Sequence, residues 1–279
     1  QVRTGRIVAA VQDIDAEGFV PRGIDWIPPS AEPATRVYIQ GVFGGDGGRR
    51  LIVHAPGDAD AVVSVRLLTE DGAFTPVDLS EVEVPAGTVA TVGLANTLQD
   101  VSGTIELTSD VPIVAGVRMR HRGVDASSSE IREDVSFATG ATPVTGVAAA
   151  AGLPAVRGTG VTLWLTAPAR GQSGSAVDDT DTQVSIRLLP FGADAVAPEP
   201  IDVSVPADRA IAVDLPRPEN AEWFTAVVTP SRPGIYVAQT SIRRGSRGTL
   251  FGGFPLATLR TTVSIPSAGR AIGVSVAGP

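Results

Sequence analysis

The sequence predicts an all-β protein made of two tandem β-sandwich domains of immunoglobulin-like size, related by an internal duplication. Two observations lead to this prediction. Strand-like blocks recur in the same order along the 279 residues, and apolar residues alternate with polar ones within those blocks. In addition, no segment shows the 3.6-residue apolar stripe with caps that is typical of a helix.

The internal repeat is the strongest signal. Val63–Leu68 (VSVRLL) matches Val184–Leu189 (VSIRLL), and upstream of each block Leu51–Pro56 corresponds to Leu163–Pro168. Three further pairs of blocks keep the same order: Val84–Ala86 with Val205–Ala207, Val92–Leu94 with Val213–Leu215, and Ile113–Ala115 with Tyr236–Ala238. The second copy has a longer loop between Ala169 and Gln183. Several matched blocks in one order indicate duplication.

Each copy is predicted to contain about seven short strands. Val63, Val65 and Leu67 alternate with Ser64 and Arg66, which is the period-2 pattern of a half-buried strand. Prolines fall at the ends of these blocks, where the missing N–H does not interrupt a ladder. Because the cysteine pair of immunoglobulin domains is missing, the likeness concerns the layered architecture only.

The domain boundary is placed in the Ala-, Gly-, Thr- and Pro-rich segment 138–154. This gives a first sandwich repeat at residues 1–142, preceded by the remnant of another repeat, and a second sandwich repeat at 143–279. The remnant is the order Ile7–Val11, then Trp26–Pro28, which resembles the end of each copy. We therefore expect that the natural protein has further N-terminal sequence containing another copy or its remnant.

Composition excludes several classes of protein. The formal charge is −8 and all 22 basic residues are arginine, so nucleic-acid binding through phosphate neutralisation is not expected. This arginine-only, Ala- and Val-rich composition is typical of a GC-rich, actinobacterial genome. With no cysteine there are no disulfides, thiolate nucleophiles or Cys-based zinc sites. No apolar run reaches the ~18–20 residues of a membrane span, and no signal segment is visible at Gln1.

Catalytic candidates are few. The two histidines are His54, whose repeat counterpart is Thr166, and His121, which stands in an arginine-rich block; both are interpreted as structural. The segment Gly171–Gly174 (GQSG) only superficially resembles the nucleophile elbow of a hydrolase, and we interpret it as a loop. No paired carboxylates for glycoside hydrolysis are marked by special context.

Acidic clusters are the most informative candidate sites. Asp178, Asp179 and Asp181 lie in the longer loop of the second copy. They are our candidate ligands for calcium. The segment Asp13–Gly18 imitates the first half of a calcium loop but lacks the glutamate at the twelfth position. Asp58 and Asp60 occupy the shorter equivalent loop. For each cluster the interpretation we favour is that the carboxylates keep a surface loop solvated. No organic cofactor is expected.

Arginine and tryptophan give weaker signals. Arg118, Arg120 and Arg122 alternate, and Arg243, Arg244 and Arg247 stand at the corresponding end of the second copy. Such residues can bind phosphate or carboxylate groups, or they can protect strand edges, which is the interpretation we favour. The tryptophans are dispersed along the chain, at Trp26, Trp164 and Trp223. Trp164 aligns with Ile52 of the first copy and is therefore expected in the core.

Three phrases, Val84–Gly87, Glu106–Ile113 and Leu163–Pro168, resemble those of an uncharacterised, domain-of-unknown-function family of secreted or membrane-anchored actinobacterial proteins. The resemblance covers most of the chain. It implies export and a cell-envelope setting, and it brings no catalytic residues. The second copy has Asp208 where the first has Gly87, which weakens the case for a shared turn geometry.

These observations favour a non-catalytic, extracytoplasmic structural or binding module of the bacterial cell envelope. Its partner would be a protein or an envelope glycan, because duplication gives two linked weak sites a high effective concentration. The alternative is a carbohydrate-active or carbohydrate-binding protein that uses loop carboxylates, since β-sandwiches host both kinds of function.

Overall fold

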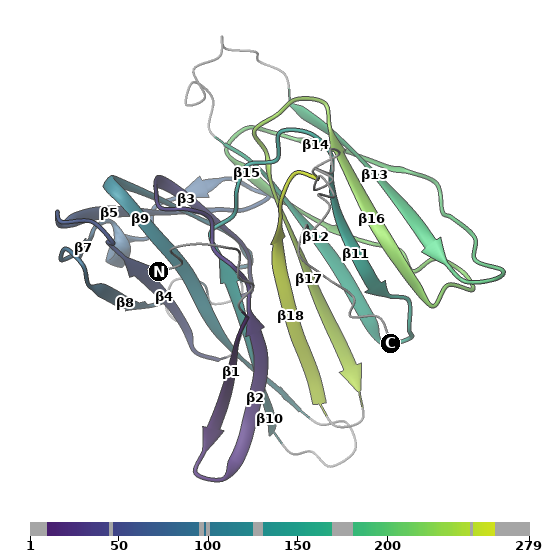
Figure 1. Cartoon of the computed structure of the whole chain (residues 1–279), viewed down its shortest axis with the longest axis horizontal. Coiled ribbons are helices and arrows are strands. Elements are labelled where there is room, and N and C mark those ends of the chain that lie inside the picture. Colours follow the sequence, from purple (N-terminus) through teal and green to yellow (C-terminus); the bar gives the residue numbers. More distant parts are fainter. Residues whose placement is uncertain are drawn as a thin grey trace, which may run out of the picture.

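The computed structural model describes residues 10–44, 47–94, 98, 101–124, 131–168, 181–245 and 248–259. The elements whose bounds are described are strands, apart from the 3-10 turn η1 (Val77–Leu79), so the all-β class is confirmed (Figure 1). None of the described segments forms a helix long and apolar enough to cross a membrane.

The strands fall into two halves on either side of residue 143. Those of the first half are β1 (Val11–Glu17), β2 (Val20–Ile27), β3 (Ala34–Val42), β4 (Arg49–His54), β5 (Ala61–Leu68), β6 (Ala73–Phe74), β7 (Val82–Val84), β8 (Val89–Gly93), β9 (Gly103–Val124) and β10 (Ile131–Thr139). Those of the second half are β11 (Ala148–Pro154), β12 (Thr159–Ala167), β13 (Thr182–Phe191), β14 (Ile201–Val205), β15 (Arg209–Asp214), β16 (Trp223–Pro230), β17 (Tyr236–Gly245) and β18 (Gly248–Leu256).

The long strand β9 organises the first half. Its first part pairs with β3 and β5, and its second part, from Val114 onward, pairs with β4 and β10. Strand β4 also pairs with β8, while β5 pairs with β6 and β7. Because β9 takes part in both layers, eight strands form one hydrogen-bonded sheet. Apolar side chains from both parts of β9 meet in one core.

The second half contains two separate four-stranded sheets. Their strand orders are β11-β16-β13-β14 and β15-β12-β17-β18, and a second core lies between them. Here the counterpart of β9 is divided into β16 and β17 by the bend at residues 231–235. The number of sheets therefore differs between the halves, because the first half keeps this strand continuous.

The order of strand pairing is nevertheless the same in both halves. Strand β5 pairs with β7 and β9 as β13 pairs with β14 and β16. Strand β4 pairs with β8 and β9 as β12 pairs with β15 and β17. The matched sequence blocks Val63–Leu68 and Val184–Leu189 lie in β5 and β13, so these predicted strands are confirmed.

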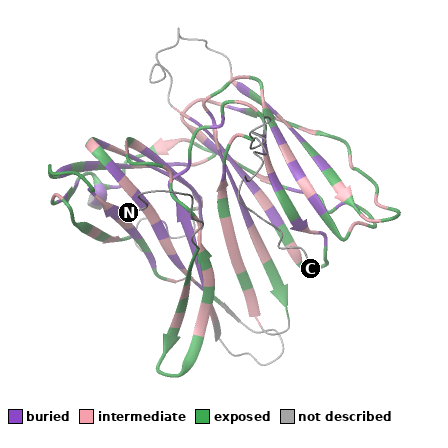
Figure 2. Cartoon of the chain, in the orientation of Figure 1, coloured by how far each residue is buried: buried purple, intermediate pink, exposed green. Residues whose placement is uncertain are grey.

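Strands β1 and β2 form a separate two-stranded sheet that projects beside β10 (Figure 1). Strand β2 approaches β10 so closely that a Cβ at Gly23 would lie 2.5 Å from the Val135 nitrogen, which requires glycine there. Figure 2 shows buried residues in the sheets of both halves, whereas no residue of β1 or β2 is buried.

Candidate functional site: the interface between the halves

A buried polar network joins the two halves. Glu106, on β9, is 2% exposed and accepts hydrogen bonds from the Tyr38 hydroxyl (2.8 Å) and from Arg66 Nη1 (2.7 Å). Arg66 Nη2 also donates to Asp208 Oδ2, in the second half, at 2.5 Å. This hydrogen bond to Asp208 raises the pKa of Arg66. The guanidinium thus connects a buried carboxylate of one half with a carboxylate of the other.

Apolar and hydroxyl contacts surround this network. The rings of Tyr38 and Tyr236 lie 4.3 Å apart between centroids, and burial raises the pKa of both hydroxyls. Thr104 and Thr166, both fully buried, share a hydrogen bond of 2.8 Å across the halves. A backbone bond from Ala210 to the carbonyl of residue 69 also crosses the interface. The halves are therefore packed together as a folded protein interior is packed.

Asp208 occupies a turn of the second half that has an equivalent, at Gly87, in the first half. Its φ is +62° and its N–H donates to the carbonyl of Ala167, as Gly87, with φ of +68°, donates to Ala55. The two turns therefore share one geometry, although the replacement of glycine by Asp208 weakened the case for this from sequence. Aspartate tolerates the left-handed conformation better than most residues, and here its carboxylate gains the ion pair with Arg66.

Aromatic rings fill the other end of the interface. His121 stacks on Phe251 with centroids 3.7 Å apart, and Phe43 lies edge-on to both rings. Trp164 is also edge-on to Phe43, at 6.0 Å, and its Nε1 donates to Thr240 at 2.9 Å. The prediction that Trp164 lies in the interior is confirmed.

Both histidines have structural contacts in this fold. His121 Nε2 lies 2.7 Å from the Ser136 hydroxyl, while His54 Nδ1 lies 2.7 Å from the carbonyl of Thr88. Burial, with a smaller effect of the Arg49 charge, lowers the pKa of His121 from 6.5 to about 3. His121 is therefore neutral at physiological pH.

This burial predicts an acid-sensitive interface. Between pH 6.5 and about 3 the unfolded state binds more protons at His121 than the folded state does, so stability falls as pH drops through this range. Lowering the pH from 7 to 4.5 should therefore reduce the free energy of unfolding less in His121→Phe than in the unmodified protein, by about 1–3 kcal/mol. Urea unfolding at both pH values measures this. Ser136→Ala keeps the imidazole and should keep the acid sensitivity; an equal loss in His121→Phe would contradict the assignment.

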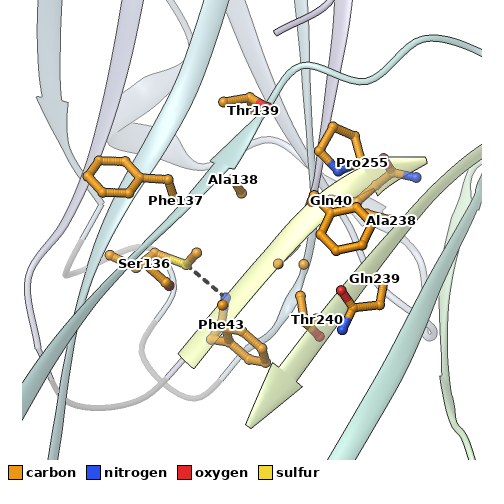
Figure 3. A pocket seen from close by; sticks show the side chains of 15 residues that line it. Gln40, Phe43, Ser136, Phe137, Ala138, Thr139, Ala238, Gln239, Thr240 and Pro255 are labelled. Carbon is orange, nitrogen blue, oxygen red and sulfur yellow. Dashed lines mark hydrogen bonds between the residues drawn. The ribbon is translucent and has the colours of Figure 1, made fainter. Parts of the chain in front are cut away.

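A small cavity lies beside the aromatic cluster, where Phe43 lines it together with residues of β3, β10, β17 and β18. Gln40, 2% exposed, has no hydrogen-bond partner for either amide atom. Gln239 and Thr240 lie on the same side of the cavity as Gln40, and Ser136 and Phe137 lie across from them (Figure 3). Its volume of about 10 Å³ is close to the minimum that holds one water molecule. This cavity suits a structural water rather than an organic substrate.

Strand β9 also binds the β1–β2 hairpin through ion pairs. Arg120 contacts Asp15 at 2.7 Å, and Arg118 contacts both Asp15 and Asp13 at 3.3 Å. Burial alone would raise the pKa of Asp15, but the hydrogen bond from Arg120 and the charge of Arg118 hold it below its ordinary value. Asp13 and Asp15 thus bind arginine in this fold, rather than forming half of a calcium loop.

The edge-protection interpretation is wrong for Arg118 and Arg120. They lie on a strand with partners on both sides, β4 and β10, and their guanidinium groups bind carboxylates of the hairpin. Arg122 contacts Glu133, which also binds Arg22 of β2, both at 2.8 Å. Arg243 and Arg244 are exposed at the end of β17. Arg247 lies outside the described residues.

Two further carboxylates lie where β2, β10 and β18 meet. Asp134 is buried, and its Oδ2 accepts a hydrogen bond of 2.7 Å from the backbone N–H of Phe251. Burial raises the pKa of Asp25 to about 6; the charge of Asp134 adds to this, and the amide of Trp26 opposes it. Burial raises the pKa of Asp134 as well. Because their raised pKa values let the folded state bind protons before the unfolded state does, these two acids increase the free energy of unfolding as the pH falls. His121 has the opposite effect.

The predicted calcium ligands are not brought together within the described residues. Asp178 and Asp179 lie outside them, as does Gly171–Gly174. Asp181 Oδ2 accepts a hydrogen bond of 2.8 Å from the Ser204 hydroxyl. Asp60, in the equivalent loop, accepts one of 2.8 Å from the backbone of Ala86. No group of three potential metal ligands occurs among the described residues. Calcium binding by Asp178, Asp179 and Asp181 stays a prediction.

Sequence reasoning missed the polar network, although one signal for it was available. Arg66 and Arg187 occupy equivalent places in the repeated block, but Arg66 faces Glu106 across the strand pair, whereas Arg187 faces Val227. The copies differ in the facing residue: β9 has Glu106 where β16 has Val227, so this acidic residue marks a contact specific to the first copy.

Comparison with known proteins assigns the family. The model of DUF5719, a family of unknown function, matches residues 1–216. The chain belongs to the DUF5719 family. This confirms the resemblance to an uncharacterised family that the strand phrases indicate. A search of curated proteins gave no match.

Solved structures show only distant likeness to this DUF5719 protein. A protein of Thermotoga maritima, described as 1070, is 16% identical with a TM-score of 0.30, over 39% of this chain and 95% of that one. A Bacteroides uniformis β-glucuronidase is 9% identical with a TM-score of 0.18, over 79% of this chain and 25% of that one. A structure of Bacteroides uniformis β-glucuronidase 2, covalently bound to cyclophellitol-6-carboxylate aziridine, is 10% identical with the same TM-score and coverage. These scores carry no argument about function.

Proposed function

We propose that this DUF5719 protein is a non-catalytic structural or binding module that works outside the cytoplasm, in the bacterial cell envelope. In this proposal its two halves are duplicated sandwich repeats held as one rigid unit. The observation that carries it is the interface network, in which Arg66 joins buried Glu106 of the first half to Asp208 of the second. A rigid interface suits a module that presents its outer surfaces in a fixed geometry.

The charged and aromatic residues of the interface support this role. Arg66, Glu106 and Asp208 bind one another, and His121 is held neutral between Phe251 and Ser136. Their polar atoms are used to hold the halves together. The equivalent order of strand pairing in the two halves supports the duplication.

A binding experiment with bacterial cell-wall glycan tests the proposal. The purified protein is mixed with insoluble cell-wall polysaccharide, and both co-sedimentation and the release of reducing ends are measured. We expect no release of reducing ends, with or without sedimentation. Release that an acidic-residue substitution abolishes would establish an enzyme and overturn the proposal. Fractionation of the natural host tests the location, and recovery of the protein in the cytoplasm would contradict it.

A further inference from the structure

The β1–β2 hairpin presents its apolar side to solvent. Direct cross-strand partners share a face, and the register pairs Asp13 with Asp25 on the side that contacts β9 and β10. The opposite face carries Ile14 paired with Ile24, and Trp26 beside them. These three side chains are 60%, 50% and 57% exposed. The hairpin is therefore polar toward the protein and apolar toward water.

Such a surface indicates a missing partner. A two-stranded hairpin is only marginally stable alone, and contiguous exposed apolar residues mark interaction surfaces. Phe19, in the turn at the hairpin tip, adds another apolar side chain and is 106% exposed. Few polar side chains accompany them, Gln12 being the one beside Trp26 in the register, whereas recognition of a glycan requires several hydrogen-bonding groups.

The structure contains the same kind of hairpin two more times. The second part of β9 with β10, and β17 with β18, are antiparallel hairpins at the end of each half. On its other edge β9 pairs with β4, and β17 pairs with β12. Strand β1 is the corresponding first strand, but within the described residues its other edge has no strand beside it.

The equivalent face of the β9–β10 hairpin shows what covers such a surface. Val135 and Phe137 of β10 alternate along that face as Ile24 and Trp26 do along β2, yet they are buried. Strand β2 covers them, because it lies directly against β10 and Gly23 approaches the backbone of Val135. In Figure 1 the β1–β2 hairpin stands beside β10. A neighbouring hairpin is therefore the natural cover for this face.

We infer that the outward face of the β1–β2 hairpin is covered by the terminal hairpin of another repeat of this fold, supplied by the same polypeptide upstream of β1. A strand equivalent to β4 and β12 then pairs with the edge of β1 that has no neighbour in the described part of the chain. This continues the stacking already present, in which β2 lies on β10. The inference rests on the repeat organisation of the proposed function but requires no particular ligand.

The test compares the full natural polypeptide with the 279-residue chain. In the full polypeptide, backbone amides of Val11–Ile27 are expected to exchange hydrogen more slowly by about tenfold or more. Ile24→Asp should lower its melting temperature by about 5 °C or more, because it places a charge in a buried hairpin contact. In the 279-residue chain the same substitution should have little effect, because Ile24 is half exposed there.

Val89→Asp is the matched control. Val89 is 57% exposed on β8, so this substitution should leave both proteins nearly unchanged. Equal exchange in the two proteins, an Ile24→Asp effect no larger than that of Val89→Asp, or the lack of an upstream repeat would each overturn the inference. Protection that arises only when soluble envelope glycan is added would do so too, since the glycan would then be the cover. Glycan cleavage, in contrast, would contradict the proposed function without altering these melting temperatures.

Discussion

Replacing Trp164 by alanine is expected to lower the free energy of unfolding by about 3–5 kcal/mol, which is typical for a large aromatic residue removed from an interior. Trp164 belongs to β12 of the second half, is buried, and packs edge-on against Phe43 of the first half. Its loss also leaves Thr240 without the indole donor. We therefore expect the intact protein to unfold in one calorimetric transition, and we expect this transition to broaden or divide in two in the variant as the halves become uncoupled.

Trp223→Ala is the control for this prediction. Trp223 lies on β16 of the same half but is 49% exposed, so its removal should cost about 1 kcal/mol or less. If both substitutions cost the same, or if Trp164→Ala leaves one sharp transition, the aromatic cluster does not couple the halves.

The second large effect is expected from Arg66→Met. This substitution keeps much of the apolar stem but removes the donors to Glu106 and Asp208. Glu106 is 2% exposed, and it would retain Arg36 as its nearest cation, at 3.5 Å. Removing one partner of a buried charge is strongly destabilising, so we expect a loss of about 2–4 kcal/mol in urea unfolding. Salt should reduce this loss only in part, because Glu106 is buried whereas Arg66 and Asp208 are 32% and 33% exposed.

Arg187→Met provides a matched control from the repeat itself. Arg187 stands at the equivalent place on β13, where its side chain is exposed and its strand neighbour is Val227. Its replacement should change stability by about 0.5 kcal/mol or less. Similar losses for the two arginines would show that the network contributes little, and would remove the main support for a rigid module.

The partners of the acidic residues explain why these residues are poor guides to a catalytic site in this protein. Asp13 and Asp15 bind Arg118 and Arg120, and Asp208 binds Arg66. Asp134 holds the edge of β18 through the N–H of Phe251. Each of these carboxylates contributes to the packing of one element on another.

The sequence by itself determined the strands, because strand formation depends on alternation within a few residues. On β5, Val63, Val65 and Leu67 alternate with polar residues, and they lie in the hydrophobic core of the first half as the pattern predicts. The matched block in β13 could be found in the same way, and so could the buried place of Trp164, from its alignment with Ile52.

Tertiary structure alone decided which faces of these strands meet. Arg66 and Asp208 are 142 positions apart, and nothing within either segment specifies that their sheets are neighbours. The same holds for Arg118, whose alternation with Arg120 predicted one shared face but not the hairpin carboxylates that cover it. Alternation fixes the side of a strand on which a residue lies, whereas its partner depends on how complete sheets pack, which is a long-range property of the whole chain.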